Sequence, residues 1–177
     1  MKLIILNAIK EWVLHKAAMG AELWPTIASE AGFGADRFIT QDNYADRERI
    51  ERLIQCLLSA LNLGRDAFRT SFFEFWMTSF APRVYQLLAR QANSARECLI
   101  QIIRLQNELC NFFPSNTYVS KVDLNDINEN ALTVIYASEK TLIDIIAVLR
   151  GVSGIYQETF TVRKINPHSS EIRFEKH

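Results

Sequence analysis

The sequence has no excess of charge of either sign. Twenty lysines and arginines balance twenty aspartates and glutamates among its 177 residues. A chain without a net positive field cannot concentrate nucleic acid or an anionic membrane surface by charge alone. We therefore expect no nucleic-acid partner, and we expect any protein partner to be recognised through local shape.

Long apolar runs are also missing. Nothing approaches the roughly 18 consecutive apolar residues that a transmembrane helix requires. The apolar amino terminus is interrupted by Lys2, Lys10 and Glu11 and lacks a small-residue cleavage site, which argues against a secretory signal. The sequence thus predicts a protein that neither spans a membrane nor carries a leader.

Cysteine is scarce and widely spaced. Cys56, Cys98 and Cys110 are odd in number and form no C-x-x-C pair, which argues against a disulfide framework and a cysteine-based metal site and favours a reducing cytoplasm. The sequence also contains no H-E-x-x-H, no phosphate-binding glycine loop and no G-x-S-x-G. We therefore do not expect an enzyme.

The first two thirds of the chain has the periodicity of helices. With 49% hydrophobic residues, the chain can bury one sizeable core, so one domain is the default. Helices are expected at 2–17 and 21–31, the second ended by Gly32 and Gly34. A third is predicted at 46–63, where apolar residues recur with helical spacing: Ile50, Leu53, Ile54, Leu57, Leu58 and Leu61.

Two further helices are expected to lie in the core. Residues 66–80 contain six aromatic side chains, so this helix must be buried on more than one side: Phe68, Phe72, Phe73, Phe75, Trp76 and Phe80. Residues 93–113 form the next helix, with an apolar stripe of Leu99, Ile102, Ile103, Leu109, Cys110 and Phe113. Gln106 completes that stripe, although its side chain is an amide.

After Pro114 the pattern changes from helical to alternating. Four strands are predicted, at 117–122, 132–137, 159–165 and 171–175. The last two are joined by a hairpin turn at 166–169, and a helix from 142 to about 155 is capped by Ser138 or Thr141. The predicted fold class is therefore α+β: a mostly helical amino-terminal part followed by a small antiparallel sheet with a crossing helix.

Several short motifs occur in an informative order along the whole chain. They are Gly20-x-x-x-Trp24 at a turn into a helix, Leu61-Asn62-Leu63 at a helix end, Phe72 in the aromatic helix, and Tyr136-Ala137-Ser138-Glu139-Lys140 at a strand end. Together they resemble the haem nitric oxide/oxygen-binding (H-NOX) family. The resemblance implies a single H-NOX-like domain over 1–177, with a helical subdomain at about 1–63 and the pocket helices and sheet at about 64–177.

The sharpest of these motifs is Tyr136-x-Ser138-x-Lys140, which resembles the family's Tyr-x-Ser-x-Arg. In the family this motif holds the two haem propionates. Alternate residues leave a strand on one side, which would group the three side chains. Lysine keeps the charge of arginine but lacks the planar fork that binds a carboxylate at two points. The resemblance implies a weakened anion site, and the plain alternative is a strand end followed by a capping serine.

Three positions depart from the family pattern. By spacing, Gln106 stands where the family's axial histidine binds iron, and an amide is a poor ligand for haem iron. Phe73 stands where the family has a small glycine, and Val119 stands where it has the proline that bends the haem. The residues expected to line the pocket are Phe72, Phe73, Trp76, Ile103, Cys110 and Val119.

Other residues are weaker candidates for an iron ligand. His15, His168 and His177 are expected to be solvated side chains. Cys110 lies one helical turn beyond Gln106, and a thiolate can bind iron. A free cysteine is nevertheless more often a small buried hydrophobe. We therefore predict no metal site.

Two functions remain open on the sequence alone. The preferred hypothesis is a haem-independent sensory or regulatory domain whose pocket is collapsed or holds an apolar small ligand. Its partner would be a signalling protein: a histidine kinase, a cyclic-dinucleotide enzyme or a cyclase. The alternative is a sensor of nitric oxide or another diatomic gas that binds haem b with atypical axial ligation. Whether the chain forms a homodimer is left open.

Overall fold

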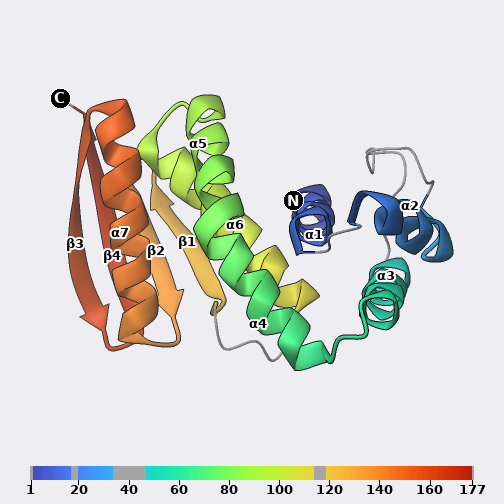
Figure 1. The fold of residues 1–177 in the computed structure, drawn as a ribbon. Helices are drawn as coiled ribbons and strands as arrows, with labels where there is room; N and C mark the ends of the chain where they lie inside the picture. Colours follow the sequence, from blue (N-terminus) through green and yellow to red (C-terminus); the bar gives the residue numbers. More distant parts are fainter. Residues whose placement is uncertain (1, 17–19, 34–46, 114–118, 177) are drawn as a thin grey trace. The chain divides into compact units, whose positions relative to one another are not determined.

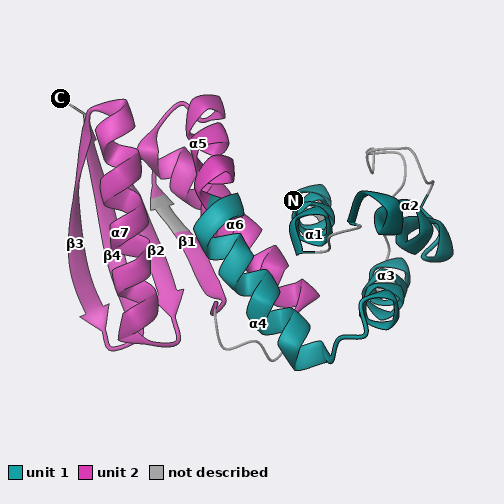
Figure 2. Cartoon of the chain, in the orientation of Figure 1, with its two compact units in different colours: residues 1–81 teal, residues 82–177 magenta. Residues whose placement is uncertain are grey.

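The computed structural model describes residues 2–16, 20–33, 47–113 and 119–176. The chain divides into two compact units, Met1–Ala81 and Pro82–His177 (Figure 2). The sequence analysis expected a subdomain boundary near residue 63, whereas the two compact units meet after Ala81. The expectation of one domain over 1–177 stays a prediction.

The first unit is helical (Figure 1). Its elements are α1 (Lys2–Lys16), α2 (Gly20–Glu30), α3 (Arg47–Ala60), α4 (Arg65–Phe75) and η1 (Trp76–Phe80). The predicted helices at 2–17 and 21–31 are confirmed as α1 and α2, although the predicted end of the first at residue 17 lies outside the described residues. The predicted start of the third helix at Asp46 and the predicted stop at Gly34 lie outside the described residues.

Two glycines allow the chain to turn around α2. A Cβ added at Gly20 would lie 2.5 Å from the Val13 carbonyl oxygen and 2.8 Å from Leu14 Cα. Only glycine therefore permits α2 to begin this close to the end of α1. Gly32 has a φ of +83°, a left-handed conformation that ends helices and favours glycine.

The sequence predicted one helix over residues 66–80, but this aromatic segment is not a single α-helix. It passes from α4 into a π-helix, η1, in which the Ala81 N–H donates to the Trp76 carbonyl. Thr78 Oγ1 donates to the Glu74 carbonyl oxygen at 2.8 Å. A π-turn widens the helix and rotates the side chains that follow it. It thereby keeps both Trp76 and Phe80 buried.

The second unit combines helices with the sheet. Its helices are α5 (Ala81–Gln91), α6 (Ala95–Phe112) and α7 (Glu139–Tyr156). The sequence patterns predicted α6 and α7 but not α5. The helical face of α5 is hard to recognise because Val84 and Leu88 are buried while Leu87 is 51% exposed.

The strands are β1 (Val122–Asn128), β2 (Ala131–Tyr136), β3 (Glu158–Asn166) and β4 (Ser169–Lys176). They form an antiparallel sheet in the order β1-β2-β4-β3. The β3–β4 hairpin is confirmed. The prediction of a strand at 117–122 was wrong, because β1 begins at Val122 and residues 119–121 form no strand; residues 117 and 118 lie outside the described residues. Val122 and Leu124 alternate with Asp123 and Asn125, which is the period of a strand, but aspartate and asparagine are uncommon in strands and masked it.

One face of the sheet carries the core of this unit. Val122, Val134, Tyr136, Ser170 and Ile172 are at most 3% exposed, and the strand register places them on the same face. Helix α7 packs against β2 and β3 and lies across the sheet in Figure 1. The predicted α+β fold, with its crossing helix, is confirmed. Within the described ranges, no helix combines the length and the apolar character needed to cross a membrane.

Candidate functional site

Helix α6 carries Gln106, the position expected to replace an iron ligand, and its amino terminus is firmly held. Ser94 is the N-cap, and its hydroxyl accepts the Glu97 N–H at 3.1 Å. The Glu97 carboxylate in turn accepts the Asn93 N–H at 2.8 Å. The pattern resembles a capping box, except that the Glu97 carboxylate accepts the N–H of Asn93, the residue before the N-cap.

The corner between α5 and α6 is held by Tyr156 at the end of α7 and Glu158 at the start of β3. The Tyr156 hydroxyl donates to the carbonyls of Ala89 and Ala92, and the buried Glu158 carboxylate accepts the Ala95 N–H at 2.9 Å. A donor thus meets the carboxyl end of α5 and an anion meets the amino end of α6, as the helix dipoles favour. Burial raises the pKa of the Tyr156 hydroxyl. This corner fixes where α6 starts.

The carboxyl-terminal half of α6 binds the backbone that leads into β1. Gln106 Nε2 donates to the Ser120 carbonyl oxygen at 2.8 Å. The Cys110 thiol donates to the Val119 carbonyl oxygen at 3.6 Å. We call this set of contacts, together with those of Asn107 described next, the α6–β1 clamp. The clamp uses the side chain that the family resemblance places at the iron.

Asn107 is the strongest member of the clamp and was not predicted from the sequence. Its Nδ2 donates to the Val122 carbonyl oxygen at 2.7 Å, and its Oδ1 accepts the Val122 N–H at 2.9 Å. The amide therefore pairs with both backbone groups of one residue, as a neighbouring strand would. Asparagine is an unfavourable residue inside a helix unless its side chain has a partner elsewhere. An asparagine inside a predicted helix was therefore the one sequence feature that could have pointed to this contact.

The three residues of the Tyr136-x-Ser138-x-Lys140 motif do not share a strand face. The strand β2 ends at Tyr136, whose buried hydroxyl lies 2.8 Å from Ser170 Oγ. Ser138 is the N-cap of α7, and its side chain accepts the Thr141 N–H. Lys140 lies in the first turn of α7 and is exposed. The alternation argument for grouping the three fails because the chain turns into a helix at Ser138.

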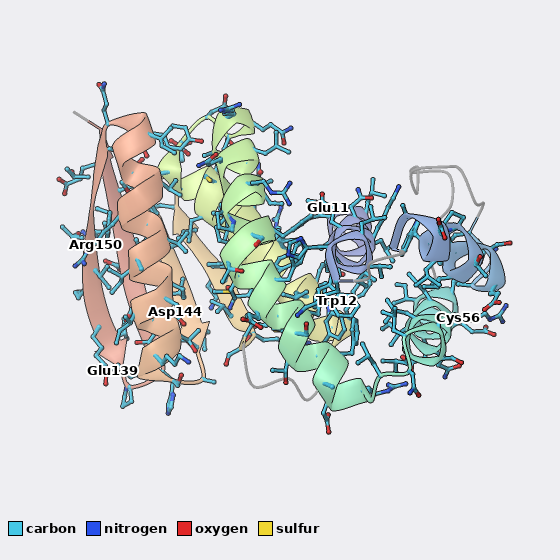
Figure 3. All side chains as sticks on the ribbon, in the orientation of Figure 1. Glu11, Trp12, Cys56, Glu139, Asp144 and Arg150 are labelled. Atoms are coloured by element: carbon cyan, nitrogen blue, oxygen red, sulfur yellow. The ribbon has the colours of Figure 1, made fainter. Side chains whose placement is uncertain are left out.

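Phe72, Phe73 and Trp76 lie in the first unit, within a chain of aromatic rings. Ring centroids are 5.7 Å apart for Phe72 and Phe73 and 6.2 Å apart for Phe72 and Trp76. Phe68 extends the chain to Trp12 of α1, with centroids 5.0 Å apart; Trp12 is labelled in Figure 3. The Trp12 indole N–H donates to Ser71 Oγ at 3.2 Å. These rings pack α1 against α4.

The predicted pocket residues divide between the two units. Phe72, Phe73 and Trp76 belong to the first unit, whereas Ile103, Cys110 and Val119 belong to the second. Phe72, Phe73, Trp76 and Ile103 are at most 1% exposed. Neither unit alone contains the whole predicted pocket.

The histidines considered as alternative iron ligands do not lie on α6, the helix of Gln106. His15 is exposed at the end of α1, beside the Phe75 ring at 5.8 Å. His168 is exposed in the turn between β3 and β4, and His177 lies outside the described residues. In the part of the chain that the structure describes, no cluster of three or more His, Cys, Asp or Glu could hold a metal ion.

The residues at the predicted haem positions fit haem poorly. The Gln106 amide is a weak iron ligand, and its donor group already binds the Ser120 carbonyl. The Tyr136 and Ser138 hydroxyls bond to Ser170 and to the start of α7. Of the motif proposed for the propionates, Ser138 and Lys140 are exposed and Tyr136 is buried.

Comparison with known proteins identifies relatives of the whole chain. The model of one family, described as Haem-NO-binding, matches residues 2–164. None of the curated proteins compared with the chain matches it.

Solved structures similar to the chain include several H-NOX proteins. An H-NOX protein from S. oneidensis in its Fe(II)NO state is 15% identical, with 100% of this chain and 99% of that chain covered and a TM-score of 0.42. An oxygen-binding H-NOX domain related to soluble guanylate cyclases is also 15% identical, with 98% and 95% covered and a TM-score of 0.40. With its family model matched over nearly its full length, the chain belongs to the Haem-NO-binding family.

Proposed function

We propose that the protein is a sensory or regulatory module of the Haem-NO-binding family that acts without haem iron and without catalysis. Family membership supports the sensory role. The proposal that it needs no haem rests on one observation above the others: the side chain at the position of the expected iron ligand is an amide bonded to the backbone at Ser120.

The engagement of Gln106 has a physical consequence for haem binding. An iron atom coordinated at this position would have to displace a hydrogen bond of 2.8 Å. Leaving this half-buried carbonyl without its donor costs about 1 kcal/mol. The amide returns little in exchange, because haem iron takes His, Cys, Met or Tyr from proteins. The balance therefore favours the hydrogen bond over the metal.

The remaining predicted haem contacts point the same way. The Tyr136 hydroxyl is paired within the sheet, and Ser138 is used to start α7. Phe73, in place of a small residue, is fully buried and packs edge-on against Phe72. We infer that the volume a porphyrin would need is filled by aromatic side chains or is used by a smaller apolar ligand.

The output of such a module is a change in a signalling partner. We propose a histidine kinase, a cyclic-dinucleotide enzyme or a nucleotide cyclase as that partner. One similar structure is described as related to soluble guanylate cyclases. The three cysteines are free thiols, which suits a reducing compartment, and we propose the cytoplasm.

The test is an absorption spectrum of the freshly purified full chain, before and after addition of haemin. We expect no Soret band at a stoichiometry approaching one haem per chain. The same measurement is made on Gln106→His, which restores an imidazole at the expected ligand position. Gln101→His is the matched control, because it places the same side chain on the same helix five residues earlier.

Each outcome bears on a separate part of the proposal. A wild-type protein that holds one haem per chain refutes haem independence. If Gln106→His binds haem while Gln101→His does not, loss of the ligand alone explains haem independence, and the filled pocket is refuted. If neither variant binds haem, the filled pocket is supported.

The second candidate function is a haem b sensor of nitric oxide or another diatomic gas. The match to a family described as Haem-NO-binding favours it. Cys110 would then be the nearest alternative ligand on α6, one turn beyond Gln106. A Soret band that is lost in Cys110→Ser but kept in Cys98→Ser would establish this alternative.

A further inference from the structure

Helix α7 has an apolar face that is exposed in the part of the chain that the structure describes. Ile143 and Ile155 are 60% and 57% exposed, more than any other large hydrophobic side chain of the described residues. Ala147 and Gly151 lie between them at a spacing of four residues and are exposed as well. The four positions therefore form one ridge along the helix, which we call the outer face of α7. Covering it would remove apolar surface from water.

One acidic and one basic side chain flank the outer face of α7. Asp144 and Arg150 are both exposed, and Figure 3 labels both on α7. Neither side chain forms an ion pair or a hydrogen bond with another described residue. They lie three residues before and three residues after Ala147, so they are six residues apart, whereas side chains that pair along a helix are three or four residues apart. Both charges are therefore available to a second molecule.

The glycine in the outer face is not explained by the packing of the single chain. A Cβ added at Gly151 would meet nothing within 4 Å, and its backbone is not in the left-handed region. Glycine weakens the interior of a helix relative to alanine. The distance between two packed helices depends on the side chains at their contact, so a glycine there allows a second helix to approach closely.

We propose that two copies of this chain associate through the outer face of α7, with the two helices antiparallel and the two-fold axis at Ala147. In such a pair, residues equally distant from the axis lie at the same level of the two helices. Asp144 is then level with Arg150 of the second copy, and symmetry forms this pair twice. Ile143 is level with Gly151 of the second copy, where the missing side chain leaves room for it. The inference does not depend on whether the protein binds haem.

Charge complementarity favours a second copy in this register. The acid and the base lie equally far from one point of the face, so the same surface supplies the partner for each of its own charges. An axis at Leu149 would leave Asp144 level with Gly154 and Arg150 level with Val148, and both charges would lose their partners. A parallel pair would set each charge level with its own kind. The charges therefore select the antiparallel pair.

The first experiment exchanges the two charges and measures the dimer Kd of the full chain by sedimentation equilibrium. We expect the wild-type chain to dimerise, and Asp144→Arg or Arg150→Asp alone to raise the Kd by about tenfold or more, because each creates two like-charge contacts. The double variant restores both pairs with the charges exchanged, so its Kd should return to within about threefold of the wild-type value. Glu129→Arg, at an exposed position in the β1–β2 turn, changes the net charge as Asp144→Arg does and should leave the Kd unchanged.

The second experiment separates the interface from the stability of the single chain. The space around Gly151 is open, and leucine is a better helix former than glycine. Gly151→Leu should therefore raise the midpoint of thermal unfolding by about 2 °C or more, followed by circular dichroism at a concentration well below the dimer Kd. The same substitution should raise the Kd by about tenfold or more, because the new side chain takes the place of Ile143 of the second copy.

The outcomes decide between this interface and its rivals. A wild-type chain that stays monomeric at every concentration overturns the proposal. So does a double variant that dimerises as weakly as the single variants, a Kd that responds equally to Asp144→Arg and Glu129→Arg, or a Kd that Gly151→Leu leaves unchanged or lowers. Recovery of the dimer in the double variant, together with a Gly151→Leu chain that is more stable but dimerises less, supports it.

Discussion

Replacing Asn107 by leucine is expected to be the most damaging single change in the α6–β1 clamp. The substitution keeps the approximate size of the side chain but removes both hydrogen bonds to Val122. Val122 is fully buried, so water cannot readily replace the lost partners. One N–H and one C=O group would be left unpaired in the interior.

The expected loss follows from that count. A buried polar group left unpaired costs about 1 to 3 kcal/mol, and two such groups place the loss in the free energy of unfolding at roughly 2 to 4 kcal/mol after partial relaxation. Gln106→Leu removes a single bond to Ser120, where the surroundings are half-exposed. It should therefore lower the free energy of unfolding by about 1 kcal/mol.

The assay is urea denaturation followed by circular dichroism and tryptophan fluorescence. Asn111→Leu is the matched control, because Asn111 lies one helical turn beyond Asn107 on α6 and is exposed. Its effect should stay within about 0.5 kcal/mol. The reasoning is refuted if Asn107→Leu is no more destabilising than Gln106→Leu, since the two hydrogen bonds would then carry no weight in the folded state.

Two further predictions concern titrating groups. Hydrogen bonding from Arg173 lowers the pKa of the Glu171 carboxyl, so the stabilisation from this carboxylate is present above its ordinary pKa and is lost as the pH falls through the lowered pKa. In Arg173→Gln, a carbon-13 NMR titration should show the Glu171 pKa move up toward its ordinary value, and an unchanged pKa would contradict this cause. Burial raises the pKa of the Cys98 thiol to about 11, so at pH 8 only roughly one Cys98 in a thousand is the reactive thiolate. Ellman's reagent should therefore label Cys56 first in the folded protein (Figure 3), and a fast phase that survives Cys56→Ser would show that this order is wrong.

Local pattern was sufficient for most of the elements. The helical spacing from Ile50 to Leu61 and the alternation around the turn at 166–169 each depend on neighbours within a few residues. Ser138 likewise caps α7 through contacts three residues away. Such features depend on short-range geometry that any chain with these residues shares, and they were predicted correctly.

Features that join distant segments were decided by tertiary structure. Asn107 meets Val122 fifteen residues later, and the Tyr136 hydroxyl meets Ser170 thirty-four residues later. The position of Gln106 in the helical stripe was readable from the sequence, but its bond to Ser120 was not. A side chain with both donor and acceptor groups could form hydrogen bonds with many different groups of the same chain, and the sequence does not show which of them it meets. Only the packing of α6 against the start of β1 determines which partner is chosen, and so whether Gln106 meets a metal or a carbonyl.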